Sequence, residues 1–231
     1  MPNSSSQLPS PEYQENWIGA FFDVDNTLIP GLSIEVLFFR HLWKLGVIGF
    51  QQMRESIWFL TQRIPPVSLS PLRRHKLYLV GQQPGFIEPL ADEFVRNEVC
   101  AKLSIRGEGI LSRHQQAGHH VALISGSPDF LVKPLADVLG VSIVQAARLQ
   151  TSEGGYTGRV YAPLPYGEGK RRIIEDLAAL YHLDLTRSYA YGDSPGDYQA
   201  LKVVGNPIVV NPIRGMTRRA KEQGWPVTEW V

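Results

Sequence analysis

The chemically most informative feature of this chain is a pair of carboxylates at the end of an apolar run. Residues 21–28 read Phe-Phe-Asp-Val-Asp-Asn-Thr-Leu, which places Asp23 and Asp25 two positions apart. Because side chains two apart on a strand point the same way, these acids can meet where a parallel sheet binds its ligands. Such close carboxylates need a shared proton or a cation, and Mg²⁺ prefers oxygen ligands beside a phosphate. A strand followed by a simple Asx turn is the alternative interpretation.

Three later segments carry polar groups that suit phosphate chemistry. Ser125 and Gly126 lie between an apolar strand and a helix start, where a hydroxyl and main-chain N–H groups can hold phosphate. Lys170 stands at another helix start, where a cation opposes the helix dipole unless an anion lies near it. Asp193 ends a second apolar strand, and Asp197 follows about one helical turn later. Taken singly, each segment could equally be a capped helix or a solvated side chain.

These polar groups stand at the ends of strands that alternate with helices. The alternation predicts an α/β fold, a Rossmann-like doubly wound parallel sheet covered by helices on both faces. Ser127 is expected to cap a helix that Gly140 ends, and a Glu-Gly-Gly turn predicts a hairpin over 149–161. The predicted strands span residues 18–24, 121–124, 142–144, 188–191 and 207–210, and the predicted core helices span 128–139, 170–181 and 198–203.

The stretch between the first two acids and the later motifs has a different pattern, with helical periodicity and no convincing strand over 29–103. Apolar residues recur at helical spacing over 34–45, which Gly46 ends, and again over 53–64, which two prolines end. This stretch therefore predicts an inserted helical subdomain. Two more helical segments are expected, one starting near Ser70 and one over 86–103.

Composition restricts the class of protein. The 231 residues are 43% hydrophobic, enough for one large core and a smaller unit, and the net charge is +1. We expect no nucleic-acid partner, because no basic-aromatic stripe occurs, and no membrane span, because no apolar stretch reaches about 18 residues. The single cysteine, Cys100, excludes an intrachain disulfide and fits a cytoplasmic location. The predicted domains are a disordered tail at 1–16, a core at 17–30 and 104–231, and a helical cap at 31–103.

The order of the motifs, Asp-x-Asp-x-Thr, then Ser, then Lys, then Gly-Asp-Ser-x-x-Asp, resembles the haloacid dehalogenase (HAD) superfamily. All four motifs occur in the expected order, and the match covers nearly the whole chain after the tail. The long insertion between Asp23 and Ser125 resembles the subfamily with a C1-type helical cap. Within that subfamily, Ser-Gly-Ser-Pro-Asp-Phe at 125–130, Gly-Glu-Gly-Lys at 167–170 and Gly-Trp-Pro-Val at 224–227 resemble the phosphoserine-phosphatase-like hydrolases of subfamily IB.

The resemblance implies a role for each matching residue. Asp23 would attack phosphorus and form an aspartyl-phosphate, while Asp25 would protonate the leaving oxygen and then activate water. Thr27 would help to orient Asp25, and Asp197 would fix Lys170 or a metal-bound water. The cofactor would be Mg²⁺, held by the Asp23 carboxylate, the main-chain carbonyl of Asp25 and Asp193. Ser125, the Gly126 amide and Lys170 would bind the phosphoryl oxygens.

The function that follows is a Mg²⁺-dependent phosphatase, a phosphomonoester hydrolase that acts on a small phosphorylated metabolite. An aspartate at the acid/base position favours ester hydrolysis over dehalogenation, because an alcohol leaving group needs a proton. Phosphoserine phosphatases carry a glutamate soon after the first motif, where residues 29–33 hold no acid and Glu35 comes late. They also carry a polar residue where Gly196 stands. Both departures weaken phosphoserine as the substrate, and phosphorylated amino acids, amino alcohols such as histidinol phosphate and phosphocholine-like compounds all fit the subfamily.

Two other functions remain open from the sequence, namely a phosphotransferase that uses the same intermediate and a non-catalytic binding protein on this fold. Substrate choice would depend on the cap, but its polar and aromatic residues fit packing or a solvated surface better than a site. These cap residues are Glu35, Arg54, Trp58, Arg73, Arg74 and His75. Surface charge is also the expectation for the basic cluster of Arg214, Arg218, Arg219 and Lys221.

Overall fold

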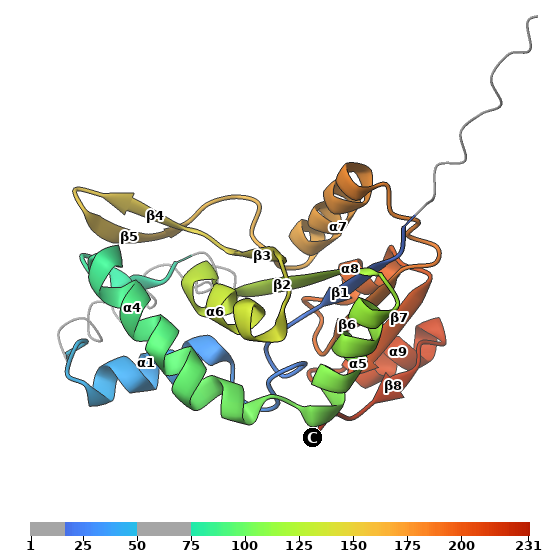
Figure 1. Ribbon diagram of the computed structural model, residues 1–231, viewed down its shortest axis with the longest axis horizontal. Coiled ribbons are helices and arrows are strands. Elements are labelled where there is room, and N and C mark those ends of the chain that lie inside the picture. Colours follow the sequence, from blue (N-terminus) through green and yellow to red (C-terminus); the bar gives the residue numbers. More distant parts are fainter. Residues whose placement is uncertain (1–16, 50–74) are drawn as a thin grey trace, which may run out of the picture.

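The computed structural model describes residues 17–49 and 75–231, and a six-stranded parallel sheet forms its centre (Figure 1). The strand order is β3-β2-β1-β6-β7-β8, and every neighbouring pair is parallel. Because β1 lies between β2 and β6, the segments that follow these three strands meet at one edge of the sheet. The strands are β1 (Gly19–Phe22), β2 (His120–Pro128), β3 (Ile143–Ala147), β6 (Tyr189–Gly192), β7 (Asn206–Val210) and β8 (Val227–Thr228).

Helices cover both faces of the sheet, as the sequence predicts for a doubly wound fold. Successive residues of β1 point to opposite faces, so Phe22 joins a core with Leu131 while Phe21 joins a second core with Ile174. The first face carries α5 (Ile105–Gln116) and α6 (Asp129–Leu139), and the second carries α7 (Glu168–Tyr181), α8 (Tyr198–Lys202) and α9 (Met216–Gln223).

The sequence analysis did not predict helix α5, nor helix α9 and the short strand β8 near the end of the chain. In α5, Gly107 and Gly109 disfavour a helix by propensity, and they interrupt the apolar periodicity of this segment. The structure explains the first glycine, because a Cβ at Gly107 would lie 2.9 Å from the ring of Trp230. Close packing of α5 on this buried tryptophan therefore outweighs the weak local preference.

The described residues of the 31–103 stretch are mainly helical, and they lie beside the predicted hairpin at one end of the molecule (Figure 1). The helices are α1 (Ile34–Lys44) and α4 (Pro84–Phe94), which continues through a π turn (Val95–Val99) and a 3₁₀ turn (Cys100–Lys102). The hairpin is β4 (Leu149–Ser152) and β5 (Gly155–Val160). A 3₁₀ turn, Leu77–Leu79, lies against this hairpin. The Lys76 N–H donates to the Gly158 carbonyl and the Gly81 N–H donates to the Tyr156 carbonyl.

The expected tail at 1–16, the expected helices over 53–64 and from Ser70, and the residues Arg54, Trp58, Arg73 and Arg74 lie outside the described residues. The division into a core and a cap at 31–103 stays a prediction. None of the helices in residues 17–49 and 75–231 has the length and apolar character needed to cross a membrane.

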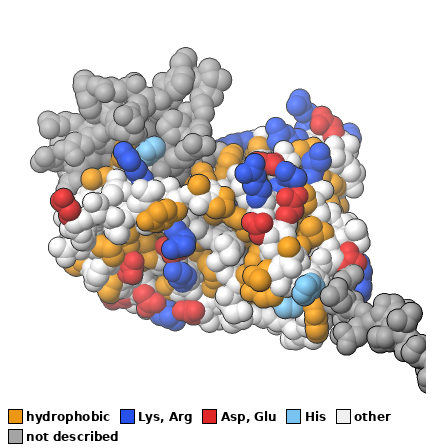
Figure 2. Space-filling model, turned by 90° about the horizontal axis from the view of Figure 1, so that it is seen from above, with side chains coloured by type: hydrophobic (Ala, Val, Ile, Leu, Met, Phe, Trp, Pro, Cys, Tyr) orange, Lys and Arg blue, Asp and Glu red, His pale blue; other side chains and the backbone are white. Residues whose placement is uncertain are grey.

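Charged side chains of both signs are interspersed on the face seen in Figure 2, over the described part of the chain. On the exposed side of α7, for example, Arg171 pairs with Glu168 and with Glu175. On this face the described charges are mixed in sign, in keeping with a net charge of +1 for the chain.

A buried histidine in helix α5 makes the stability of the fold depend on pH. His114 of α5 is only 8% exposed, and its Nε2 lies 2.8 Å from the Tyr191 hydroxyl while its Nδ1 lies 2.7 Å from Nδ1 of His119. Burial, followed by the charges of His119 and Arg113, lowers the pKa of His114 to about 4. The folded protein therefore holds this imidazole neutral at pH values where the unfolded chain, with a pKa of about 6.5, takes up a proton.

We predict that the free energy of unfolding falls as the pH drops from about 6.5 towards 4, because protonation of His114 favours the unfolded chain. The stabilisation is complete above the unfolded pKa and is lost through this window. Urea unfolding at about pH 7 and about pH 5 should show a smaller pH dependence for His114→Gln than for the wild type. His182→Asn, at a left-handed helix end that asparagine tolerates, is the matched control. An unchanged pH dependence in His114→Gln would contradict the assignment.

Candidate active site

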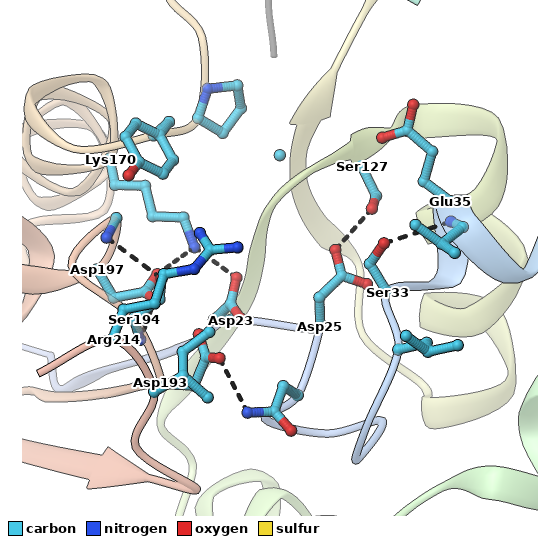
Figure 3. A pocket seen from close by; sticks show the side chains of 18 of the residues that line it. Asp23, Asp25, Ser33, Glu35, Ser127, Lys170, Asp193, Ser194, Asp197 and Arg214 are labelled. Carbon is cyan, nitrogen blue, oxygen red and sulfur yellow. Dashed lines mark hydrogen bonds and ion pairs between the residues drawn. The ribbon is translucent and has the colours of Figure 1, made fainter. Parts of the chain in front are cut away.

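The four sequence motifs meet around one pocket of about 420 Å³ at the carboxyl edge of the sheet (Figure 3). The segment after β1 supplies Asp23 and Asp25, and the first turn of α7 supplies Lys170. The loop between β6 and α8 supplies Asp193 and Asp197. The structure thus brings together the acids and the lysine that the sequence singled out, as the sheet order requires.

Lys170 lies at the centre of the charged groups, where it joins two motifs. Its Nζ donates to Asp23 Oδ1 at 2.5 Å and to Asp197 Oδ1 at 2.6 Å, and all three residues are buried. Burial opposes the charge on Lys170, but Asp197 and Asp23 outweigh it and raise the pKa of the lysine. Burial alone would raise the pKa of Asp197, yet Lys170 and two hydrogen bonds from Ser194 lower it. Asp197 is therefore an ionised carboxylate that fixes Lys170 in place.

Three carboxylates gather beside this lysine, and they fit a divalent cation. Oxygens of Asp23, Asp193 and Asp197 all lie within 4.8 Å of one another. Burial and neighbouring carboxylates raise the pKa of Asp23 although Lys170 opposes them, and burial followed by the Asp197 charge raises the pKa of Asp193 to about 7. The three carboxylates outnumber the one ammonium beside them, and a hard cation with oxygen ligands would balance the excess negative charge.

Asn26 contributes to this acid cluster, and the sequence analysis gave it no role. Its Nδ2 donates to Asp193 Oδ2 at 3.0 Å and to the main-chain carbonyl of Asn211 at 2.9 Å. Asn26 adopts a positive φ of 56°, a conformation that asparagine tolerates better than most residues. This side chain thus ties the turn after β1 to the loops that follow β6 and β7.

Asp25 is held apart from the lysine by its own pair of hydrogen bonds. The Ile34 main-chain N–H donates to Oδ1 at 2.8 Å, and the Ser127 hydroxyl donates to Oδ2 at 2.6 Å. Burial raises the pKa of Asp25, while these two bonds oppose the rise. A carboxyl group that keeps its proton more readily than usual is suited to act as a general acid.

The hydroxyls of Ser127 and Thr27 both donate to carboxylates of the site. Ser127 does not cap α6, because Pro128 takes the capping position without a side-chain bond and the Ser127 hydroxyl is engaged by Asp25. The buried Thr27 hydroxyl donates to Asp23 Oδ2 at 3.3 Å, and its role in orienting Asp25 stays a prediction. The difference at Ser127 arises because β2 runs on to Pro128, further than the apolar run predicts.

The predicted phosphate-binding pair lies at the end of β2. Gly126 lines the pocket, and a Cβ at this position would approach the Pro165 carbonyl to 3.7 Å, an ordinary contact. Ser125 is fully buried behind it, and its hydroxyl accepts a hydrogen bond from the Ser127 N–H at 3.1 Å. The phosphate-binding role of both residues stays a prediction.

Two side chains that the sequence analysis placed outside the site line the pocket. Glu35, in the first turn of α1, forms an ion pair with buried Lys76, and both line the pocket. Arg214, which was expected to be surface charge, is exposed but also lines the pocket. Periodicity could not reveal either residue, because long-range packing brings each of them to the pocket.

Phosphoserine phosphatases carry a polar residue at the position of Gly196, and the structure gives a steric reason for the glycine here. A Cβ at this position would lie 2.3 Å from Cε2 of Tyr166, so the tyrosine ring occupies the space that a side chain would need. The Gly196 carbonyl also accepts a hydrogen bond from the Gly167 N–H at 2.7 Å. Here the pocket wall is therefore an aromatic ring, where the resemblance led us to look for a polar side chain.

We predict that Ser127→Ala lowers kcat about tenfold, because Asp25 loses the bond that orients it, while KM changes little. Steady-state kinetics against 4-nitrophenyl phosphate measure the effect. Ser112→Ala, on the exposed side of α5, is the matched control. An unchanged kcat in Ser127→Ala would show that the Ser127 hydroxyl does not position Asp25 for catalysis.

The comparisons with known proteins agree with this site. The family model for haloacid dehalogenase-like hydrolases matches residues 20–202. The chain belongs to the haloacid dehalogenase-like hydrolase family. A probable phosphatase of Mycobacterium tuberculosis is 31% identical over 90% of this chain and 74% of its own length. A phosphoserine phosphatase of the same organism is 28% identical over 91% and 70%.

Solved structures agree on the HAD fold. A Bordetella pertussis protein of unknown function superposes with a TM-score of 0.80 at 25% identity, covering 94% of this chain and 100% of its own. A phosphoserine phosphatase with a phospho-aspartyl intermediate analogue gives 0.63 at 21% identity, covering 92% and 93%. The predictions of a HAD phosphatase of the phosphoserine-phosphatase-like kind and of a Rossmann-like core are confirmed.

Proposed function

We propose that this HAD phosphatase hydrolyses a small phosphorylated metabolite with Mg²⁺ and through an aspartyl-phosphate on Asp23. The observation that supports it most is the contact of one buried ammonium, that of Lys170, with Asp23 at 2.5 Å and Asp197 at 2.6 Å, with Asp193 close by. A non-catalytic binding protein gains nothing from such an arrangement, because buried charges cost stability.

Asp23 has the position of a nucleophile. Its Oδ1 is neutralised by Lys170, and its Oδ2 accepts a long 3.3 Å hydrogen bond from Thr27. An oxygen of the carboxylate can then attack phosphorus while Lys170 stabilises the negative charge that develops on the phosphoryl oxygens. The main-chain N–H groups near Gly126 are the further donors that we assign to the phosphoryl group.

Asp25 completes the reaction from the other side of the pocket. Its raised pKa lets it donate a proton to the ester oxygen as the bond to phosphorus breaks, and the ionised carboxylate then takes a proton from the attacking water. The hydrogen bonds from Ser127 and Ile34 hold both carboxylate oxygens in place during this exchange.

The donor set fits Mg²⁺, which would be held by the carboxylates of Asp23 and Asp193 and by the main-chain carbonyl of Asp25. Asp197 is less suited to direct ligation, because its oxygens already accept bonds from Lys170 and Ser194. When bound, the ion would neutralise charge on the transferring phosphoryl group.

Phosphate release from 4-nitrophenyl phosphate tests the proposal, because this ester needs no recognition of its leaving group. We expect release that depends on added Mg²⁺ and that EDTA abolishes. Release that is unaffected by EDTA would overturn the metal assignment, and no release from any phosphomonoester would overturn the hydrolase. Added alcohols distinguish transfer from hydrolysis, since a phosphotransferase would form new esters at the expense of free phosphate.

A further inference from the structure

Apart from the catalytic and proposed metal-binding groups, the charged side chains described on the pocket wall include one cation without an anionic partner. Among the described residues, Glu35, Lys76 and Arg214 are the other charged side chains that line the pocket. Glu35 and Lys76 pair with each other, so their charges cancel. Within the described part of the chain, no carboxylate lies within ion-pair distance of the Arg214 guanidinium. The wall that faces a leaving group thus carries a net positive charge.

The loop that bears Arg214 is fixed to the catalytic motifs. Asn211 Nδ2 donates to the Asn26 carbonyl at 2.9 Å while Asn26 returns a bond of the same length, and the Ile213 N–H donates to the Asp193 carbonyl at 3.0 Å. Arg214 itself adopts a positive φ of 50°, which a residue with a Cβ tolerates only when its surroundings impose it. A rigid loop therefore presents this guanidinium to the pocket.

Figure 3 shows the direction of the side chain. Arg214 lies on the same side of the pocket as Lys170 and Asp193, and Glu35 lies on the opposite side, beyond Asp25. Apolar side chains complete the lining, among them Leu32, Val36, Leu164, Pro165 and Ile213. A small organic body with a charged end can therefore bind between the apolar lining and the arginine.

We propose that the natural substrate is a phosphomonoester whose leaving group carries a second anionic group, and that Arg214 binds that group. This inference rests on the proposed function and narrows its substrate class. A carboxylate and a second phosphate share the required chemistry, because both accept paired hydrogen bonds from a guanidinium. A leaving group that ends in an ammonium would be repelled by Arg214 and Lys76. The carboxylate of Glu35 would offer it little compensation, because it already pairs with Lys76.

A matched series of esters tests the inference. Propyl phosphate is compared with three-carbon phosphomonoesters whose far end is an ammonium, a carboxylate or a second phosphate. The wild type should show a kcat/KM about tenfold higher for an anionic end than for the methyl end, the gain expected of one charge-assisted hydrogen bond. The carboxylate and phosphate arms identify which anion is preferred.

Variants at Arg214 then assign the preference to one side chain. Arg214→Met should reduce the ratio of kcat/KM between anionic and methyl-ended esters to about one, mainly through KM, and Arg214→Lys should keep part of it. Arg218→Met, at an exposed position in helix α9 where the arginine pairs with exposed Glu222, is the control and should keep the full ratio. Thermal melts check that each variant is folded.

The outcomes separate this inference from the proposed function. A wild type that prefers the methyl-ended or ammonium-ended ester, or a ratio that Arg214→Met leaves unchanged, would overturn the anionic leaving group while hydrolysis itself stands. If no ester releases phosphate, the proposed function fails, and calorimetric binding of the same four esters decides the inference. Tighter binding of the anionic esters that Arg214→Met abolishes would support it, and equal binding of all four would overturn it.

Discussion

Asp23→Asn is expected to lower kcat by at least about a thousandfold, because the amide cannot attack phosphorus as a carboxylate does. The variant should still fold, since asparagine has nearly the same shape as aspartate and its amide oxygen can still accept the hydrogen bond from Lys170. Phosphate release from 4-nitrophenyl phosphate measures the loss, and the thermal melt shows that the fold persists.

The matched control for this variant is Asp176→Asn, which makes the same chemical change on the exposed side of α7. It should retain the wild-type kcat. A folded Asp23→Asn protein with most of its activity would exclude Asp23 as the nucleophile.

Lys170→Met is expected to lose both activity and stability. The ammonium touches Asp23 and Asp197, so its removal leaves two buried carboxylates without a counter-charge, which costs roughly 3–5 kcal/mol of unfolding free energy. Activity should fall by at least about a hundredfold, because the charge on the phosphoryl oxygens loses its partner. Urea unfolding and steady-state kinetics give the two values.

Magnesium provides a further readout for Lys170→Met. The added cation should raise the melting temperature of this variant more than that of the wild type, since it balances the uncompensated acids. Lys133→Met removes a largely exposed lysine that pairs with Asp129 four residues earlier on the same helix, and it should cost less than about 1 kcal/mol. Equal stabilities of wild type and Lys170→Met would contradict the charge network.

The strands and helices of the core could be predicted from the periodicity of apolar residues, because the apolar face that the pattern marks is the face that packs. The apolar run before Asp23 is β1, and its alternating phenylalanines fill two separate cores. The hairpin over 149–161 formed where the Glu-Gly-Gly turn predicted it. Helix α5 was missed because Gly107 and Gly109 weaken its local pattern, and the packing of Gly107 against Trp230 is a long-range contact that a local pattern cannot reveal.

The acids and the lysine of the site could be predicted because they lie at strand ends and helix starts, where a motif carries both the chemistry and the position. Asp197 was expected to hold Lys170, but two other residues that hold the acids in place were not predicted. Asn26 and Ser127 act through hydrogen bonds to Asp193 and Asp25, and these bonds depend on the path of the chain after each strand. Arg214 was missed because a helical pattern of basic residues suggests solvent, whereas its loop is tied to the turn after β1.

Trapping of the covalent intermediate tests the central claim most directly. Asp25→Asn protein, incubated with Mg²⁺ and 4-nitrophenyl phosphate and then treated with borohydride, should yield homoserine at position 23, because hydride reduces an acyl-phosphate to an alcohol. Mass spectrometry of the peptide locates the change, and it should require the ester. Homoserine at another position, or phosphate release by the wild type with no reduced residue in either protein, would contradict an aspartyl-phosphate on Asp23.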